Sequence, residues 1–123
     1  MRITDKPSSS RLFLMVRQDE AAALAQTLNE VLHGFRPARF DPSFEKVRES
    51  GEELLQRFLI LFREYGESSE LEIGLSNAEA ITLRLAAELC IEHIHGSEFS
   101  TRIGASTEEM KRYIQLLGRQ ITP

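Results

Sequence analysis

The sequence contains one cysteine, no excess of positive charge and no long uncharged run. Cys90 cannot form a disulfide within the chain, which excludes a disulfide-stabilised extracellular scaffold and favours a reducing compartment. The longest stretch without Asp, Glu, Lys or Arg is residues 21–29, nine residues, whereas a membrane-spanning helix needs about 20 apolar residues. Residues 1–10 are polar and lack the apolar centre of a secretory signal. These absences predict a cytoplasmic protein that does not enter a membrane.

Basic residues are outnumbered by acidic ones. Lys and Arg number 15 and Asp and Glu 19, so the formal net charge is −4. A net negative charge gives no overall attraction to phosphate or anionic lipid. This balance argues against a strongly basic nucleic-acid binder.

Motifs that hold phosphates or position a nucleophile are also missing. The seven glycines are dispersed and form neither a phosphate-binding loop nor a Gly-x-Ser-x-Gly turn. Cys90 lies between Leu89 and Ile91, a setting typical of a small buried side chain rather than a nucleophile. We therefore predict no enzyme activity and no cofactor.

A chain of 123 residues, 41% of them hydrophobic, has the size and composition of one domain with one core. We predict a polar, mobile lead-in over residues 1–10 and a single domain over residues 11–123. Apolar periodicity and capping signals divide that domain into two strands and about five helices. The expected strands cover 12–16 and 71–75, and the expected helices cover 19–34, 42–65, 77–94, 97–103 and 107–118. The predicted class is α+β, mostly helical.

Several local details follow from the same patterns. The uninterrupted apolar run at residues 12–16 predicts a strand buried on both faces, and Asp19 is the expected cap of the next helix. His33-Gly34 is read as a left-handed helix stop. Ser50-Gly51 is a point where the long helix could break.

The densest apolar run is residues 54–62, with seven large apolar residues in nine. We therefore expect it to lie deep in the core, with both Phe58 and Phe62 buried.

Two segments suggest an internal β-α-α duplication. Residues 30–34 and 92–96 share the pattern Glu-x-[Leu/Ile]-His-Gly, and each closes the helix that follows a strand. The intervals after them differ, so the repeat stays a hypothesis.

The same segments contain two Glu-x-x-His pairs, Glu30/His33 and Glu92/His95. This spacing occurs in carboxylate-bridged metal pairs, which also need a Glu from each of two other helices. No such outside ligand is evident, because Glu88 lies on the same helix as Glu92. A histidine in the last helical turn is also explained by the helix dipole. We expect no metal.

Residues 99–114 resemble a helix-turn-helix motif. Ser100 stands where the helices would cross, Gly104 makes the turn, and Ile103, Met110 and Tyr113 form the expected seam. The resemblance implies a DNA-binding regulator that uses four basic residues over 98–117 and just beyond: Arg102, Lys111, Arg112 and Arg119.

The motif departs from that family at the start of its second helix. Glu108 and Glu109 stand where the family contacts base edges beside phosphates, and carboxylates oppose the approach to a polyanion. A helical corner that only packs is the simpler interpretation.

The remaining lead is an acidic run. Residues 67–98 hold seven glutamates against Arg84 alone, a local balance of −6. These glutamates are Glu67, Glu70, Glu72, Glu79, Glu88, Glu92 and Glu98. A solvated face is the ordinary explanation, but carboxylates gathered on one side would steer a basic partner protein. Small acidic inhibitor and immunity proteins act this way, by functional analogy alone.

The sequence thus favours a non-catalytic protein-binding domain with an acidic contact surface. The helix-turn-helix DNA-binding regulator is the alternative, and a metal enzyme built on the Glu-x-x-His pairs ranks third.

Overall fold

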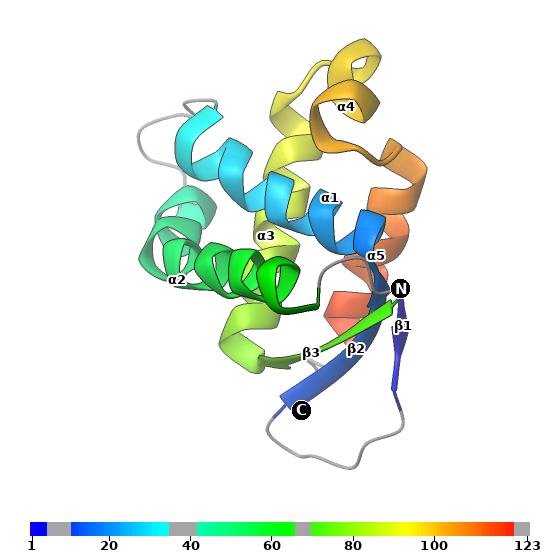
Figure 1. The fold of residues 1–123 in the computed structure, drawn as a ribbon. Coiled ribbons are helices and arrows are strands. Elements are labelled where there is room, and N and C mark those ends of the chain that lie inside the picture. Colours follow the sequence, from blue (N-terminus) through cyan, green and yellow to red (C-terminus); the bar gives the residue numbers. More distant parts are fainter. Residues whose placement is uncertain (5–10, 35–41, 66–69, 120–123) are drawn as a thin grey trace.

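The computed structural model describes residues 1–4, 11–34, 42–65 and 70–119. Its elements in chain order are β1 (Arg2–Ile3), β2 (Arg11–Arg17), α1 (Gln18–Asn29), the π-helix η1 (Glu30–Gly34), α2 (Pro42–Tyr65), β3 (Glu70–Ser76), α3 (Asn77–His93), α4 (Gly96–Ile103) and α5 (Thr107–Arg119). The predicted α+β class is confirmed, because a mostly helical chain carries one antiparallel sheet of order β1-β2-β3 (Figure 1). No helix in these residues is long and apolar enough to cross a membrane.

The sheet has one buried face. Leu12, Leu14 and Val16 of β2 are buried, whereas Phe13 and Met15 between them are only half-buried. β3 alternates in the same way, as its sequence predicts. The expectation that β2 is buried on both faces is therefore wrong, because the helices cover a single face of an antiparallel sheet.

The first residues belong to the sheet. Arg2 pairs with Met15 and Ile3 with Leu14, so β1 lies along the second edge of β2. The segment expected as a lead-in, residues 1–10, thus begins with a two-residue strand, and residues 5–10 lie outside the described residues. β1 thereby makes β2 the central strand of the sheet, with β3 on its other side.

β2 and β3 start two similar strand–helix units. Both strands have seven residues, and they pair about their midpoints, Leu14 and Ile73. A helix begins directly after each, with a glutamate at its third position, Glu20 in α1 and Glu79 in α3. A local two-fold relation therefore connects the units, which fits the proposed duplication.

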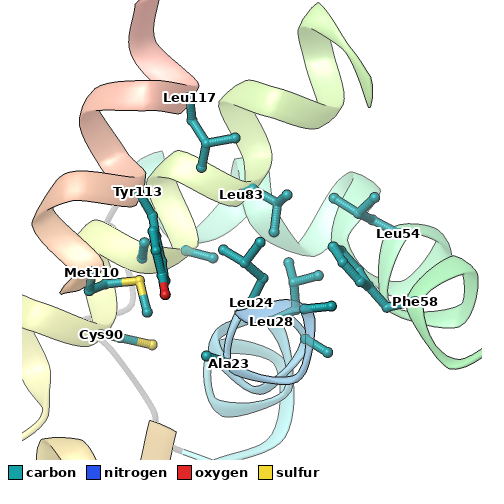
Figure 2. Packing of buried hydrophobic residues seen from close by; sticks show 14 of the residues in the cluster. Ala23, Leu24, Leu28, Leu54, Phe58, Leu83, Cys90, Met110, Tyr113 and Leu117 are labelled. Carbon is teal, nitrogen blue, oxygen red and sulfur yellow. The ribbon is translucent and has the colours of Figure 1, made fainter. Parts of the chain in front are cut away.

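α3 is the central helix. It packs against α1, α2 and α5, whose buried side chains meet around Leu83 (Figure 2). Phe58 from α2 and Tyr113 from α5 are among the largest fully buried side chains.

The run at residues 54–62 is less buried than expected. Phe58 is buried as predicted, but Phe62 is only half-buried, and Leu59 and Ile60 are 44% and 48% exposed. The expectation for Phe62 is wrong because α2 packs on α1 and α3 with one side, while the apolar residues extend around the helix.

The structure differs from the sequence predictions at three points in the first two long helices. Glu20, rather than Asp19, caps α1 by accepting a hydrogen bond from the Arg17 N–H at 2.9 Å. α1 continues into η1, and within the described residues only Gly104 has a positive φ, so the left-handed stop at Gly34 is wrong. α2 runs unbroken through Gly51, which packs against Leu32.

Candidate binding surfaces

The acidic run is distributed over three elements. Glu70 and Glu72 lie on β3, Glu79, Glu88 and Glu92 on α3, and Glu98 on α4, whereas Glu67 lies outside the described residues. Glu79 and Glu92 are separated by most of α3, roughly 20 Å at the helical rise of about 1.5 Å per residue. The carboxylates therefore form two groups, one beside β3 and one at the far end of α3.

Arginines stand beside four of these glutamates. The pairs are Arg2–Glu70 at 3.8 Å, Arg57–Glu79, Arg84–Glu88 at 3.8 Å and Arg102–Glu98 at 3.9 Å. Three of these arginines come from outside residues 67–98. The surface around the glutamates is therefore less negative than the charge of −6 counted along residues 67–98. Glu92 is exposed and has no ion pair within the described part of the chain.

A pocket lies at the outer edge of β3, and we call it the β3-edge pocket. It has a volume of about 190 Å³ and is lined by Arg57, Ile60 and Leu61 of α2 and by Glu72, Ile73 and Gly74 of β3. Its walls combine three aliphatic side chains, the Glu72 carboxylate and the Arg57 side chain. Glu72 thus lines a concave, partly apolar surface, whereas Glu70 lines a different hollow together with Arg2 and Arg17.

Arg57 covers part of that edge. The Thr4 N–H donates to the Phe13 carbonyl at 2.9 Å, so the backbone of Phe13 faces β1 and that of its partner Gly74 faces away from β2. Arg57 Nη2 donates to the outward Gly74 carbonyl at 2.7 Å. The arginine thereby occupies a backbone acceptor that the open strand edge would otherwise offer to another strand.

The Arg57 guanidinium is also engaged by Glu79. Glu79 accepts from Arg57 and from the Ser76 N–H at 2.8 Å, and the Glu79 N–H donates to Ser76 Oγ, which completes a capping box at the start of α3. Burial disfavours the Glu79 carboxylate, but these hydrogen bonds outweigh it and lower its pKa below the ordinary value of 4.5. The charge of Arg57 is therefore neutralised inside the protein.

α4 and α5 have the arrangement of a helix-turn-helix. α4 has eight residues, Gly104 follows in the left-handed region with φ 90°, and a Ser106/Glu109 capping box begins α5. Ile103 and Met110 are buried, which confirms the expected seam, but Ser100 is exposed and does not stand at the crossing.

Tyr113 ties the last helix to α1. Its hydroxyl donates to Glu109 at 3.3 Å and to the buried Glu20 at 3.5 Å, and Figure 2 shows the ring lying between α5 and α1. Burial, together with these carboxylates, raises the pKa of Tyr113 to about 12. The seam is therefore anchored in the core.

The basic residues near this motif differ in exposure and in whether they form ion pairs within the protein. Lys111 and Arg112 are exposed on α5, together with Glu108 and Gln115. Arg102 instead turns inward and forms an ion pair with the buried Glu30 of η1. Arg119 is the last residue of α5, and its side chain lies outside the described residues.

The two Glu-x-x-His pairs do not converge. Glu30 binds Arg102, and His33 Nε2 lies 2.9 Å from an Oε1 of Glu52. His95 accepts from the Ser97 N–H and caps α4. Across the described ranges, no three His, Cys, Asp or Glu side chains lie close enough to hold a metal.

Cys90 is buried in α3, as predicted. Its thiol donates to the Thr27 carbonyl, with 3.6 Å between Sγ and oxygen. Burial, together with the nearby Glu30 carboxylate, raises the pKa of Cys90 to about 12. A thiol protonated at neutral pH is a poor nucleophile.

A second concave surface was not expected from the sequence, and we call it the α1/α2 groove. Two adjoining hollows of about 300 and 450 Å³ share Ala22 and Phe62. Between them they are also lined by Gln18, Asp19, Ala25, Gln26, Asn29, Leu55 and Leu59. The signal for it was the number of apolar residues in 54–62, which exceeds what one helix face can bury.

Comparison with known proteins leaves the chain without an assigned relative. No family model, no curated protein and no solved structure matches it at a significant level.

Proposed function

We propose that this chain is a non-catalytic protein-binding domain that takes a basic side chain of its partner into the β3-edge pocket. One observation carries the proposal: Glu72 lines a hollow whose other walls include Ile60, which is 48% exposed. Lys and Arg have an aliphatic stem below a cationic head. Ile60 and Leu61 would contact the stem, and Glu72 would accept hydrogen bonds from the head.

The size and charge of the pocket fit that ligand. Its volume of about 190 Å³ is smaller than the roughly 300–1,000 Å³ of small-molecule sites. Arg57 does not repel the incoming cation, because Glu79 already neutralises it. Glu70 on the same strand is exposed but pairs with Arg2 at 3.8 Å, so Glu72 is the carboxylate on which the proposal relies.

Selection of peptides from a random phage-displayed library tests this function. We expect enriched sequences to contain Lys or Arg beside an apolar residue. Glu72→Gln and Ile60→Ser should each weaken a selected peptide by about tenfold, roughly 1.4 kcal/mol. Glu92→Gln is the matched control, because Glu92 lies in the same acidic run but away from the pocket.

Two outcomes contradict the proposal. Enriched peptides without Lys or Arg would show that the ligand is not a basic side chain. Unchanged peptide affinity in Glu72→Gln would show that the ligand does not bind at Glu72. Binding should also weaken with added salt, since screening acts on a partly exposed carboxylate.

DNA binding by α4 and α5 is the second candidate. It is favoured by the eight-residue α4, the turn at Gly104 and the exposed Lys111, Arg112 and Gln115. It is opposed by Glu108 in the first turn of α5 and by the engagement of Arg102 with Glu30. We therefore rank it below protein binding.

Fluorescence anisotropy with mixed-sequence duplex DNA decides between the two. A competent binder has a non-specific Kd of about 1–100 μM near physiological salt. Binding in that range that is lost in Lys111→Ala/Arg112→Ala would promote DNA binding, and its absence would remove this candidate. Each lost phosphate contact should lower the salt slope by about one.

A further inference from the structure

We propose that a second copy of this chain docks in the α1/α2 groove, with the two α2 helices packed antiparallel about a two-fold axis close to Leu59. This interaction is separate from the β3-edge pocket, which lies on another side of α2. Its occupant is a copy of the chain itself, because both the shape and the charges of this face are self-complementary.

The shape argument rests on large and small residues side by side. Leu55, Leu59 and Phe62 follow steps of four and three along α2 and form one stripe, as in helices that pack in pairs. The neighbouring wall of the groove comes from α1 and contains the small residues Ala22 and Ala25 beside Gln26 and Asn29. Leu59 of one copy, 44% exposed in the single chain, can therefore enter the hollow between the alanines of the other.

The charge argument rests on the two ends of the same stripe. Glu52 precedes Leu55 by three residues, and Arg63 directly follows Phe62. Both are exposed. Glu52 Oε1 lies 2.9 Å from His33 Nε2 of the same chain, whereas Arg63 has no ion pair within the described part of the chain. In an antiparallel pair, Glu52 of each copy lies toward Arg63 of the other, so two ion pairs flank the apolar centre.

This pattern distinguishes a second copy from other occupants. A parallel arrangement would set Glu52 against Glu52 and Arg63 against Arg63, which like-charge repulsion disfavours. A uniformly basic or acidic helix would satisfy only one end of the stripe. The antiparallel two-fold pair satisfies both ends and covers the uncovered apolar residues.

Sedimentation velocity over a concentration series tests the proposal. We expect the wild-type chain to show a concentration-dependent monomer–dimer equilibrium. Leu59→Ser should weaken the dimer by about tenfold or more, the effect of losing a central apolar contact. Ile60→Ser is the matched control: it is an equally exposed apolar residue of α2 outside the groove, and its variant should dimerise like the wild type.

A charge exchange tests the antiparallel geometry. Glu52→Arg and Arg63→Glu should each weaken the dimer, and the double variant should restore it. Circular dichroism checks that each variant is folded, which the surface position of all three residues favours.

Three outcomes overturn the proposal. The first is a wild-type chain that stays monomeric up to about 1 mM, where even weak specific pairs associate. The second is a dimer that Leu59→Ser leaves intact or that Ile60→Ser disrupts equally. The third is a double charge variant that fails to recover dimerisation. None of these results affects peptide binding at Glu72, so the proposed function is tested independently.

Discussion

Phe58 is the α2 side chain whose truncation should cost the most. It is fully buried, and its ring centroid lies 6.5 Å from that of Phe62. Phe58→Ala removes buried apolar surface and leaves a cavity, so we expect a loss of about 3–5 kcal/mol in the free energy of unfolding. Urea denaturation monitored by circular dichroism measures it.

Phe62→Ala provides the comparison for that loss. Phe62 is half-buried, so its removal should cost less than Phe58→Ala. Equal losses for the two variants, or a loss under about 1 kcal/mol for Phe58→Ala, would contradict the assignment of Phe58 to the centre of the core.

Glu79 should make the stability of the protein depend on pH. Its pKa is lowered in the folded state, so its stabilisation is fully present above the unfolded pKa near 4.5 and is lost as the pH falls through the folded pKa. We expect Glu79→Gln to be less stable than the wild type at pH 7, with the difference shrinking as the medium is acidified below that value. Urea melts at several pH values measure the difference.

Glu92→Gln serves as the control for Glu79→Gln. Glu92 is exposed and unpaired within the described residues, and its replacement should change stability by about 0.5 kcal/mol or less. A Glu79→Gln deficit that stays constant down to pH 2 would show that the loss does not come from the ionised carboxylate.

At the scale of elements, the turn between α4 and α5 depends on Gly104. Its φ of 90° lies in the left-handed region, and its N–H donates to the Ser100 carbonyl at 2.8 Å. Gly104→Ala should therefore destabilise the protein by about 1–2 kcal/mol, because a Cβ is strained in that conformation. Thermal melts of the two proteins measure the loss.

Gly96→Ala is the internal control for the turn. Gly96 begins α4, has no positive φ, and an added Cβ there meets nothing within 4 Å. Its replacement should be neutral or stabilise the helix by up to about 1 kcal/mol. If both substitutions destabilise equally, the left-handed turn is not the cause.

The ion pair between Glu30 and Arg102 connects elements that are distant in the sequence. It fastens η1 to α4 across 72 residues, and Gly34 leaves room for the carboxylate, since a Cβ there would lie too close to Glu30 Oε2. The π-helical turn at residues 30–34 thus has a packing role, because it places Glu30 against Arg102.

For the whole molecule, the two strand–helix units should not fold separately. β2 pairs with β3, Ser50 Oγ lies 2.6 Å from Thr82 Oγ1, and Arg57 binds Glu79, so pairing and packing cross between the units. We expect fragments 1–66 and 67–123 each to lack a cooperative unfolding transition, and their mixture to recover helical circular dichroism. Separate domains of about 60 residues are marginal even with a complete core.

A fragment 1–66 that unfolds cooperatively by itself would contradict the prediction that each unit needs the other to fold. The control is the intact chain at the same molar concentration, because association of fragments depends on concentration and folding of one chain does not.

Features encoded within a few residues were predictable. The alternation of Leu71, Ile73 and Leu75 specifies a strand with one buried face, and Ser106 with Glu109 specifies a helix start, because each depends on neighbours within one turn or one pleat. The class, the positions of the five helices and the burial of Cys90 follow from such local patterns.

The candidate sites depend on contacts that no local pattern contains. Arg57 and Glu79 are 22 residues apart, so this neutralisation within the acidic run became visible only in the folded chain. The ion pair between Glu30 and Arg102, 72 residues apart, likewise exists only in the folded chain. Leu59 and Ile60 are exposed because α2 packs on other helices with one side only. How many elements surround a helix is decided by the assembled fold and cannot be read from the sequence of that helix. Side-chain charge and hydrophobicity are fixed by residue type, but which of them meet a partner inside the chain and which face outward is set by packing.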